Sequence, residues 1–197
     1  MPDFPADAES SGFAKIALRD RLLATRRSLT THDRRSAAAR VQAALVTLVR
    51  TTAAPVIAAY VPVGAEPGGD LPGLLAPYGR VLLPVLLPGG DLDWVEYAGS
   101  LESGPRGLLQ PAGPRLGVAA VAAAGLVVVP ALAVDRRGMR LGRGGGSYDR
   151  ALARVPAGVP TVALLHDGEL LESVPTEQHD RPVGAVITPS GGLLSVR

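Results

Sequence analysis

The first part of the chain has the apolar spacing of helices. No glycine or proline interrupts Ala14 to Arg27, where basic and apolar side chains share one edge at helical spacing: Lys15, Arg19, Leu22 and Arg26. A second helix is predicted over about His32 to Val49, with Thr30 or Thr31 as its N-cap. Its apolar stripe consists of Val41, Ala44, Leu45 and Leu48.

From residue 55 onward the pattern changes to short β-branched apolar runs separated by Pro, Gly and Asp. The predicted strands are Val56–Val61, Arg80–Leu87, Leu92–Tyr97, Leu126–Val129, Thr161–Leu165 and Ala185–Thr188. Candidate crossover helices are Leu71–Ala76, Ala119–Ala124 and Tyr148–Arg154. Several runs are apolar on both faces, as in parallel strands covered by helices. We therefore predict an α/β fold, a single three-layer domain with a central mostly parallel sheet flanked by helices.

This domain is expected to cover residues 13–197, because no long linker or solenoid-length repeat divides it. Residues 1–12 are polar and acidic, with no basic region ahead of an apolar stretch, so we interpret them as a disordered tail and not as a secretory signal. The uncharged run Leu116–Val134 is long enough to suggest a membrane span. Its Ala- and Gly-rich first half inserts weakly, which favours a short helix followed by a buried strand.

Composition excludes several classes of site. The chain of 197 residues is 47% apolar and can bury a core without metals or disulfides. The absence of cysteine removes disulfides, thiolate metal sites and Cys nucleophiles, and is consistent with a cytoplasmic protein. The three histidines, His32, His166 and His179, form no H-E-x-x-H motif, and no serine lies in G-x-S-x-G. Zinc hydrolases and serine hydrolases are therefore disfavoured.

The charged residues include a single lysine. A net charge of +2 and 4% aromatic residues do not form the basic, aromatic-lined surface of nucleic-acid binders, so neither nucleic acid nor a membrane is expected as a partner. The basic residues are 19 arginines and one lysine, Lys15. On its own, this lysine is best interpreted as one exposed side chain in an arginine-rich composition.

A glycine-rich segment carries the strongest chemical signal. Four of the five residues at 142–146 are glycine, and a predicted helix follows them. Glycine lets successive backbone N–H groups turn toward one centre, and a helix N-terminus adds its positive end, so the pattern favours phosphate. Arg140 and Arg143 would supply the counter-charge.

Better-known phosphate loops do not match this segment. No lysine follows the last glycine as the Walker A motif requires, and the dinucleotide pattern G-x-G-x-x-G fails at Ser147. From the residues alone, a flexible surface turn is about as well supported as an anion site. The paired arginines and Asp149 favour the anion site.

The segment Arg140-Leu-Gly-Arg-Gly-Gly-Gly-Ser-Tyr-Asp149, which follows Pro130 and Asp135, resembles the hallmark R-L-G-x-G-x-G-x-Y-D of the 5-formyltetrahydrofolate cyclo-ligase (methenyltetrahydrofolate synthetase) family. Three further motifs of that family occur in the same order. They are K-x-x-x-R at Lys15 and Arg19, a strand followed by an acid at 59–66, and V-P-x-E-x-x-D at 174–180. The four matches span nearly the whole chain from residue 15.

The chain departs from the family pattern at three places. Ser147 stands where the family usually has an aromatic residue, and Gly145 where many members carry lysine. Gly68-Gly69 follows Glu66 where a Val/Thr continuation is common. The first departure removes an aromatic face that could pack on a pterin or a nucleotide, although Tyr148 adjoins it.

The resemblance implies an enzyme that uses ATP and Mg²⁺ to convert 5-formyltetrahydrofolate into 5,10-methenyltetrahydrofolate, giving ADP and phosphate. In this family the formyl oxygen attacks the γ-phosphate, N10 attacks the phosphorylated intermediate, and phosphate leaves. Such chemistry depends on positioning and on neutralising phosphate charge, so a protein nucleophile is not needed.

The resemblance also implies roles for residues. ATP would contact Lys15, Arg19, Arg140, Leu141, Gly142, Arg143, Gly144, Gly145, Gly146, Ser147 and Tyr148, with Arg140 and Arg143 as the catalytic residues. The folate would contact Val61, Glu66, Arg143, Gly144, Gly145, Gly146 and Ser147. Mg²⁺ would be held by Asp149 and Asp180, since it prefers carboxylate oxygens together with water and phosphate.

Plainer roles remain open for some of these residues. Lys15 and Arg19 could form a solvated basic edge. Asp149 could be a first-turn aspartate favoured by the helix dipole, and Asp180 a loop aspartate.

Three further residues have candidate roles. Tyr60 and Trp94 could pack on a ring, but single aromatic residues are more often part of the core. Asp135 is expected to shape a turn that ends in Gly138.

Two other functions stay open at this point. One is a non-catalytic folate- or nucleotide-binding relative of the same family, suggested by Ser147 and Gly145. The other is an unrelated phosphosugar or coenzyme A enzyme on a similar sheet. We expect a monomer or a weak homo-oligomer.

Overall fold

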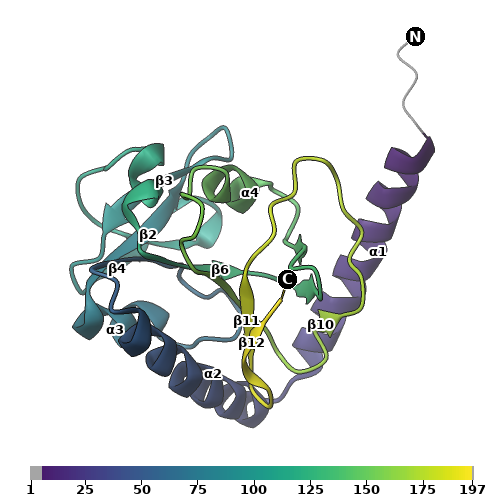
Figure 1. Ribbon diagram of the computed structural model, residues 1–197, viewed down its shortest axis with the longest axis horizontal. Coiled ribbons are helices and arrows are strands. Elements are labelled where there is room, and N and C mark those ends of the chain that lie inside the picture. Colours follow the sequence, from purple (N-terminus) through teal and green to yellow (C-terminus); the bar gives the residue numbers. More distant parts are fainter. Residues whose placement is uncertain (1–5, 197) are drawn as a thin grey trace.

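The computed structural model describes residues 6–196 and begins with two long helices (Figure 1). Helix α1 covers Ala6–Ser28 and helix α2 covers Thr31–Thr52. Thr30 is the N-cap of α2: its hydroxyl accepts a hydrogen bond from the Asp33 backbone N–H, and the Asp33 carboxylate accepts one from the Thr30 backbone N–H. The capping box explains why the chain turns sharply between the two helices.

A seven-stranded sheet forms the centre of the molecule. In spatial order its strands are β12 (Gly192–Ser195), β11 (Ala185–Thr188), β9 (Thr161–Leu164), β6 (Leu126–Pro130), β1 (Val56–Ala58), β2 (Arg80–Leu86) and β3 (Leu92–Glu96). The strands from β11 to β2 are parallel, whereas the two edge strands pair antiparallel. The predicted fold class, a mostly parallel sheet flanked by helices, is confirmed.

Helices cover both faces of the sheet, as the two-sided apolar strands require. Helix α2 and the short helix α3 (Leu71–Leu75) pack on one face through Val41, Leu45, Val49, Leu71 and Leu75. The 3₁₀ helix η3 (Val118–Ala123) and helix α4 (Ser147–Leu152) pack on the other face through Val121, Ala151 and Leu152. The central strands are therefore buried between two apolar layers.

Smaller elements surround this core. Strands β7 (Ala133–Asp135), β8 (Arg140–Leu141) and β10 (Leu170–Leu171) form a second sheet, and β4 (Leu101–Ser103) pairs with β5 (Leu109–Pro111). The remaining 3₁₀ turns are η1 (Ala76–Tyr78) and η2 (Pro105–Gly107). Helix α1 packs through Leu22 on Leu132, Ala133, Leu141 and Val174, beside this second sheet. Figure 1 shows the first turns of α1 extending beyond the body of the molecule.

Several sequence expectations need correction. Helix α1 begins at Ala6, so residues 6–12 are helical and not part of a disordered tail, while residues 1–5 lie outside the described residues. The crossover helix expected at Ala119–Ala124 is the 3₁₀ helix η3. Strand β1 ends at Ala58, three residues before the predicted end; residues 59–63 are irregular, and a turn at 64–65 leads to Glu66.

The uncharged run Leu116–Val134 is not one long helix. It contains η3, the buried strand β6 and most of β7, as the short-helix interpretation predicts. Across residues 6–196, no helix has both the length and the apolar character that a membrane crossing needs.

Asp135 shapes the expected turn. Its buried carboxylate accepts hydrogen bonds from the backbone N–H groups of Arg137 and Met139, both at 2.9 Å. Gly138 has φ +79°, and a Cβ there would collide with the Val183 carbonyl oxygen. Only glycine fits this turn, which leads directly into β8.

A buried ion pair fixes α1 to the rest of the domain. Arg26 donates two hydrogen bonds of 2.7 Å to the Glu169 carboxylate and one of 2.6 Å to the Ala131 carbonyl. Arg26 is 2% exposed and Glu169 4% exposed. Losing one member of such a pair leaves the other charged group buried without its counter-charge.

We predict that Arg26→Met lowers the free energy of unfolding by about 3–5 kcal/mol, the range for breaking a buried pair. Urea denaturation measures this difference. The control is Arg136→Met, because Arg136 pairs with Glu172 at an exposed site and should contribute little. Equal stability losses in the two variants would contradict the assigned role of Arg26.

Candidate active site

A cavity of about 580 Å³ opens at the carboxyl ends of β1 and β6. These neighbouring strands lie where the chain order reverses, because β1 leads to β2 on one side and β6 leads to β9 on the other. Ligands of open α/β sheets bind at this kind of position. All fifteen site residues predicted from the sequence line the cavity: Lys15, Arg19, Val61, Glu66, Arg140, Leu141, Gly142, Arg143, Gly144, Gly145, Gly146, Ser147, Tyr148, Asp149 and Asp180.

Lys15 is buried and fully engaged, so the interpretation as an exposed lysine is wrong. Its ammonium group lies 2.7 Å from Asp180 Oδ2 and 3.2 Å from Glu177 Oε1. Asp180 Oδ2 also accepts a hydrogen bond of 2.8 Å from the Glu177 backbone N–H. These contacts join the first helix to the segment that follows β10, which runs alongside α1 in Figure 1.

Arg19 lies one helical turn after Lys15 and reaches the glycine segment. Its Nε donates a hydrogen bond of 3.0 Å to the Gly142 carbonyl. A Cβ built on Gly144 would lie 3.6 Å from the Arg19 guanidinium carbon. The basic edge of α1 is therefore in contact with the site and is not a solvated edge.

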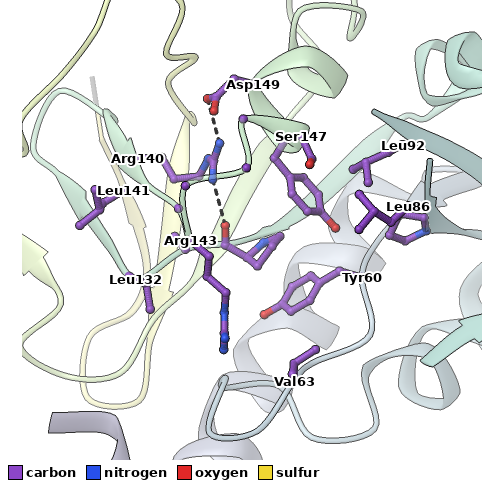
Figure 2. A pocket seen from close by; sticks show the side chains of 18 of the residues that line it. Tyr60, Val63, Leu86, Leu92, Leu132, Arg140, Leu141, Arg143, Ser147 and Asp149 are labelled. Carbon is purple, nitrogen blue, oxygen red and sulfur yellow. Dashed lines mark hydrogen bonds and ion pairs between the residues drawn. The ribbon is translucent and has the colours of Figure 1, made fainter. Parts of the chain in front are cut away.

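The glycine loop, residues 142–146, is closed by an ion pair between its two flanking residues. Arg140 Nη2 donates a hydrogen bond of 2.8 Å to Asp149 Oδ1, and Figure 2 shows the two side chains directed toward each other across the loop. Arg140 Nη1 lies 3.4 Å from the Pro130 carbonyl oxygen. Asp149 Oδ1 accepts a further hydrogen bond from the Arg181 backbone N–H. Asp149 is thus held by specific partners and not only by a helix dipole.

Two of these glycines have backbone angles that other residues rarely adopt. Gly144 has φ +105° and Gly146 has φ +63°. The left-handed angle at Gly146 starts helix α4 directly after the loop. These angles explain why glycine is needed here.

On the opposite side of the cavity, Glu66 faces the loop. Its carboxylate lies 3.1 Å from Arg143 Nε and accepts a hydrogen bond of 2.9 Å from the Val63 backbone N–H. The Glu66 side chain is almost buried, whereas Arg143 is half exposed. Val61 lines the same wall.

Two tyrosines line the cavity between these groups. Burial raises the pKa of the Tyr60 and Tyr148 hydroxyls, and the nearby Glu66 carboxylate raises both further. Tyr60 donates its hydroxyl hydrogen to the Pro67 carbonyl at 3.1 Å. Both rings are therefore neutral at physiological pH. Trp94 does not line the cavity and belongs to the core.

The motifs did not identify the apolar lining of the cavity. It comes from α1, the β2–β3 hairpin, the β4–β5 hairpin and the chain after β6, and includes Ile16, Leu86, Leu92, Leu108, Leu109 and Leu132. Figure 2 shows Leu86 and Leu92 together on the side facing Ser147. Single leucines give no sequence signal that separates a cavity wall from the core. Glu177 and His179, in contrast, lie inside a recognised motif.

Asp149 and Asp180 could supply part of the coordination of a metal ion that also binds water and substrate oxygens. Arg140 engages Asp149 Oδ1 and Lys15 engages Asp180 Oδ2, while Asp180 Oδ1 lies 3.7 Å from His179 Nε2. Among residues 6–196, no group of three or more acidic or histidine side chains could hold a metal ion alone. Because Mg²⁺ usually takes one or two carboxylates plus water and substrate oxygens, two aspartates that line one cavity fit it.

Comparison with known proteins agrees with this geometry. The model of the 5-formyltetrahydrofolate cyclo-ligase family matches residues 12–189. A 5-formyltetrahydrofolate cyclo-ligase from Mycolicibacterium smegmatis is 40% identical over 195 residues, which cover 93% of this chain and 98% of that protein. The cyclo-ligase from Escherichia coli is 38% identical over 117 residues, 56% of this chain and 64% of its own length.

Solved structures give the same result. The NMR structure of 5,10-methenyltetrahydrofolate synthetase from Aquifex aeolicus superimposes with a TM-score of 0.77 at 26% identity, covering 93% of each chain. A Mycoplasma pneumoniae protein of the same name shares the fold with a TM-score of 0.70 at 18% identity, over 87% of this chain and 96% of its own. With sequence, fold and site in agreement, the chain belongs to the 5-formyltetrahydrofolate cyclo-ligase family.

Proposed function

We propose that this protein converts 5-formyltetrahydrofolate and ATP into 5,10-methenyltetrahydrofolate, ADP and phosphate, with Mg²⁺. The observation that carries the proposal is the gathering of all four family motifs around one cavity. Its basic groups come from α1 and the glycine segment, and most of its leucines come from the two hairpins. This arrangement suits a polyphosphate next to ring systems whose faces pack on apolar side chains.

The reaction breaks one phosphoanhydride bond and forms a ring. The formyl oxygen attacks the γ-phosphorus, the O–P bond to ADP breaks, and the formyl carbon becomes a good electrophile. N10 then attacks this carbon, the carbon–oxygen bond to phosphate breaks, and phosphate leaves. The protein must hold two substrates in line and neutralise phosphate charge, and it needs no side-chain nucleophile.

The residues around the cavity can perform these tasks. In the proposal, Lys15, Arg19 and Arg140 stabilise the phosphates together with the loop N–H groups. Arg143 reaches both substrates from the half-exposed side of the loop, opposite Glu66.

In the proposal, other residues contact the folate and the metal ion. Val61 and Glu66 contact the folate, and the carboxylate can accept hydrogen bonds from pterin N–H groups. Asp149 and Asp180 would hold Mg²⁺, which would supply positive charge against the phosphates when bound. The cytoplasmic location and the monomeric or weakly oligomeric state stay predictions.

The direct test is incubation with 5-formyltetrahydrofolate and MgATP while the absorbance of methenyltetrahydrofolate is followed. Phosphate release should match product formation. Tight folate binding without ATP consumption would instead support a non-catalytic relative. Binding of a sugar phosphate or coenzyme A, but not of folate, would point to a different enzyme class.

We predict that Lys15→Met weakens the use of ATP by about 1.5–3 kcal/mol, the contribution of a charge-assisted hydrogen bond. In kinetics this is a roughly ten- to hundredfold loss in kcat/KM for ATP. The variant should also be less stable, because Asp180 and Glu177 lose their cation. Arg21→Met is the matched control, since Arg21 is an exposed cation of the same helix outside the cavity. Unchanged ATP kinetics in Lys15→Met would eliminate the assignment.

Asp180→Asn and Asp149→Asn should both raise the Mg²⁺ concentration needed for half-maximal turnover, because the amide keeps an oxygen but loses the charge. The same shift should appear when Mg²⁺ is titrated against the thermal protection that ATP provides. Asp20→Asn, an exposed change on α1, controls for net charge. If the Mg²⁺ titrations of these variants coincide with the parent's, the two aspartates do not hold the metal.

Gly144→Ala should abolish most turnover, because alanine disfavours φ +105° and the loop would have to change its backbone conformation. A misplacement of about 1 Å can reduce the rate on the order of a hundredfold. Gly158→Ala introduces similar backbone strain at φ +87°, in an exposed loop outside the cavity. It should lower stability by about 1–2 kcal/mol without changing the kinetics. Near-parental turnover in Gly144→Ala would show that the loop is a surface turn with no role in catalysis.

A further inference from the structure

Arg150 holds the glycine loop from outside the cavity. Its Nη2 donates hydrogen bonds to the Gly145 carbonyl at 2.9 Å and to the Gly90 carbonyl at 2.6 Å. It is not one of the residues that line the cavity, although the preceding residues 140–149 include many that do. A Cβ built on Gly146 would lie 3.3 Å from Arg150 Nη1, so the guanidinium packs closely against the outer surface of the loop.

This contact fixes the direction of a backbone N–H group. The peptide bond between Gly145 and Gly146 is trans, and in a trans peptide the C=O and N–H bonds point in opposite directions. Because Arg150 holds the Gly145 carbonyl on its own side, the Gly146 N–H points the other way. Gly145 and Gly146 both line the cavity, so that direction leads toward the bound phosphate of the proposed function.

The same guanidinium connects the two sides of the cavity. Gly90 lies in the turn between β2 and β3, and this turn is flanked by the cavity residues Leu86 and Leu92. A second arginine also anchors this turn: Arg154 forms a bidentate ion pair with Asp91 at 2.6 and 2.9 Å, and its Nη1 lies 3.3 Å from the Arg150 carbonyl oxygen. Unlike Arg154, Arg150 contacts both the turn and the glycine loop.

We propose that Arg150 is a positioning residue for phosphoryl transfer: it orients the Gly145–Gly146 peptide so that its N–H faces the phosphate, and it sets the distance between the loop and the β2–β3 turn. The inference deepens the proposed function and rests on it. Because Arg150 acts through the loop backbone, its removal affects the use of ATP and leaves the folate contacts of Val61 and Glu66 in place.

Arg150→Ala tests this inference in the full-length protein. We expect kcat/KM for ATP to fall about ten- to a hundredfold, as for a small displacement of a catalytic group, with a smaller change in KM for 5-formyltetrahydrofolate, whose contacts at Val61 and Glu66 lie outside the loop. Millimolar guanidinium chloride should restore part of the lost activity, because it can occupy the vacated position between the two carbonyls. Arg150→Lys should recover only part of it, since an ammonium group lacks the planar fork.

Arg154→Gln is the matched control, because it releases the β2–β3 turn without touching the glycine loop. It should lower the melting temperature and keep parental ATP kinetics. Parental ATP kinetics in Arg150→Ala, equal kinetic losses in the two variants, or no effect of guanidinium would each overturn the proposal. If Arg150→Ala does not fold, Arg150→Lys must show the ATP-specific loss.

A readout without turnover separates this inference from the proposed function. Thermal protection by MgATP should decrease in Arg150→Ala and be retained in Arg154→Gln. If the parent protein binds MgATP but makes no methenyltetrahydrofolate, the proposed function fails while the role of Arg150 is still tested by protection. Equal protection of the parent and Arg150→Ala would overturn the role of Arg150 alone.

Discussion

The ion pair between Arg140 and Asp149 is the interaction on which the geometry of the cavity depends. Both side chains are largely buried, and removing two charges from water is costly unless further hydrogen bonds satisfy them. Asp149 obtains one from the Arg181 backbone, and the Arg140 guanidinium lies against the Pro130 carbonyl. The pair therefore fixes β8, the end of β6, the start of α4 and the chain near Asp180 together. The glycines between them can adopt unusual angles because both ends of the loop are held.

The position of helix α1 also depends on basic side chains that are paired with groups from other parts of the chain. Its basic residues at 15, 19 and 26 lie along one face, and each has a separate partner from a distant part of the chain. The Arg26 pair with Glu169 is the most buried and anchors the helix. Earlier turns of the helix then carry Arg19 to the Gly142 carbonyl and Lys15 to Asp180. A residue with no direct access to the cavity thus determines where two cavity cations lie.

The sequence predicted the parts of this arrangement that repeat locally or carry a motif. Two-sided apolar strands specified the parallel sheet, and the four motifs specified residues that lie around one cavity. The start of α1 was mispredicted because residues 6–12 lack an apolar stripe, and the small sheet of β7, β8 and β10 was missed because its strands are only two or three residues long. No pattern in the sequence could show that Lys15 is buried, because its burial comes from Glu177 and Asp180, more than 160 residues away. The leucines of the cavity wall could not be predicted either, because their position also depends on contacts between segments that are distant in the sequence.

Each of three cationic side chains in the cavity is paired with a carboxylate, and a bound phosphate would compete with that carboxylate. Lys15 is neutralised by Asp180 and Glu177, Arg140 by Asp149, and Arg143 by Glu66. A phosphate that draws Lys15 toward itself leaves the Asp180 carboxylate without its cation in a nearly buried position, which is unfavourable by itself. Asp180 then needs a new positive partner, and the Mg²⁺ that accompanies ATP in solution carries the required charge. In the proposed function, the same carboxylates that stabilise the free protein would therefore favour nucleotide with metal over nucleotide alone. This exchange of partners would explain why the proposed phosphate site places two acidic residues next to the only lysine of this chain.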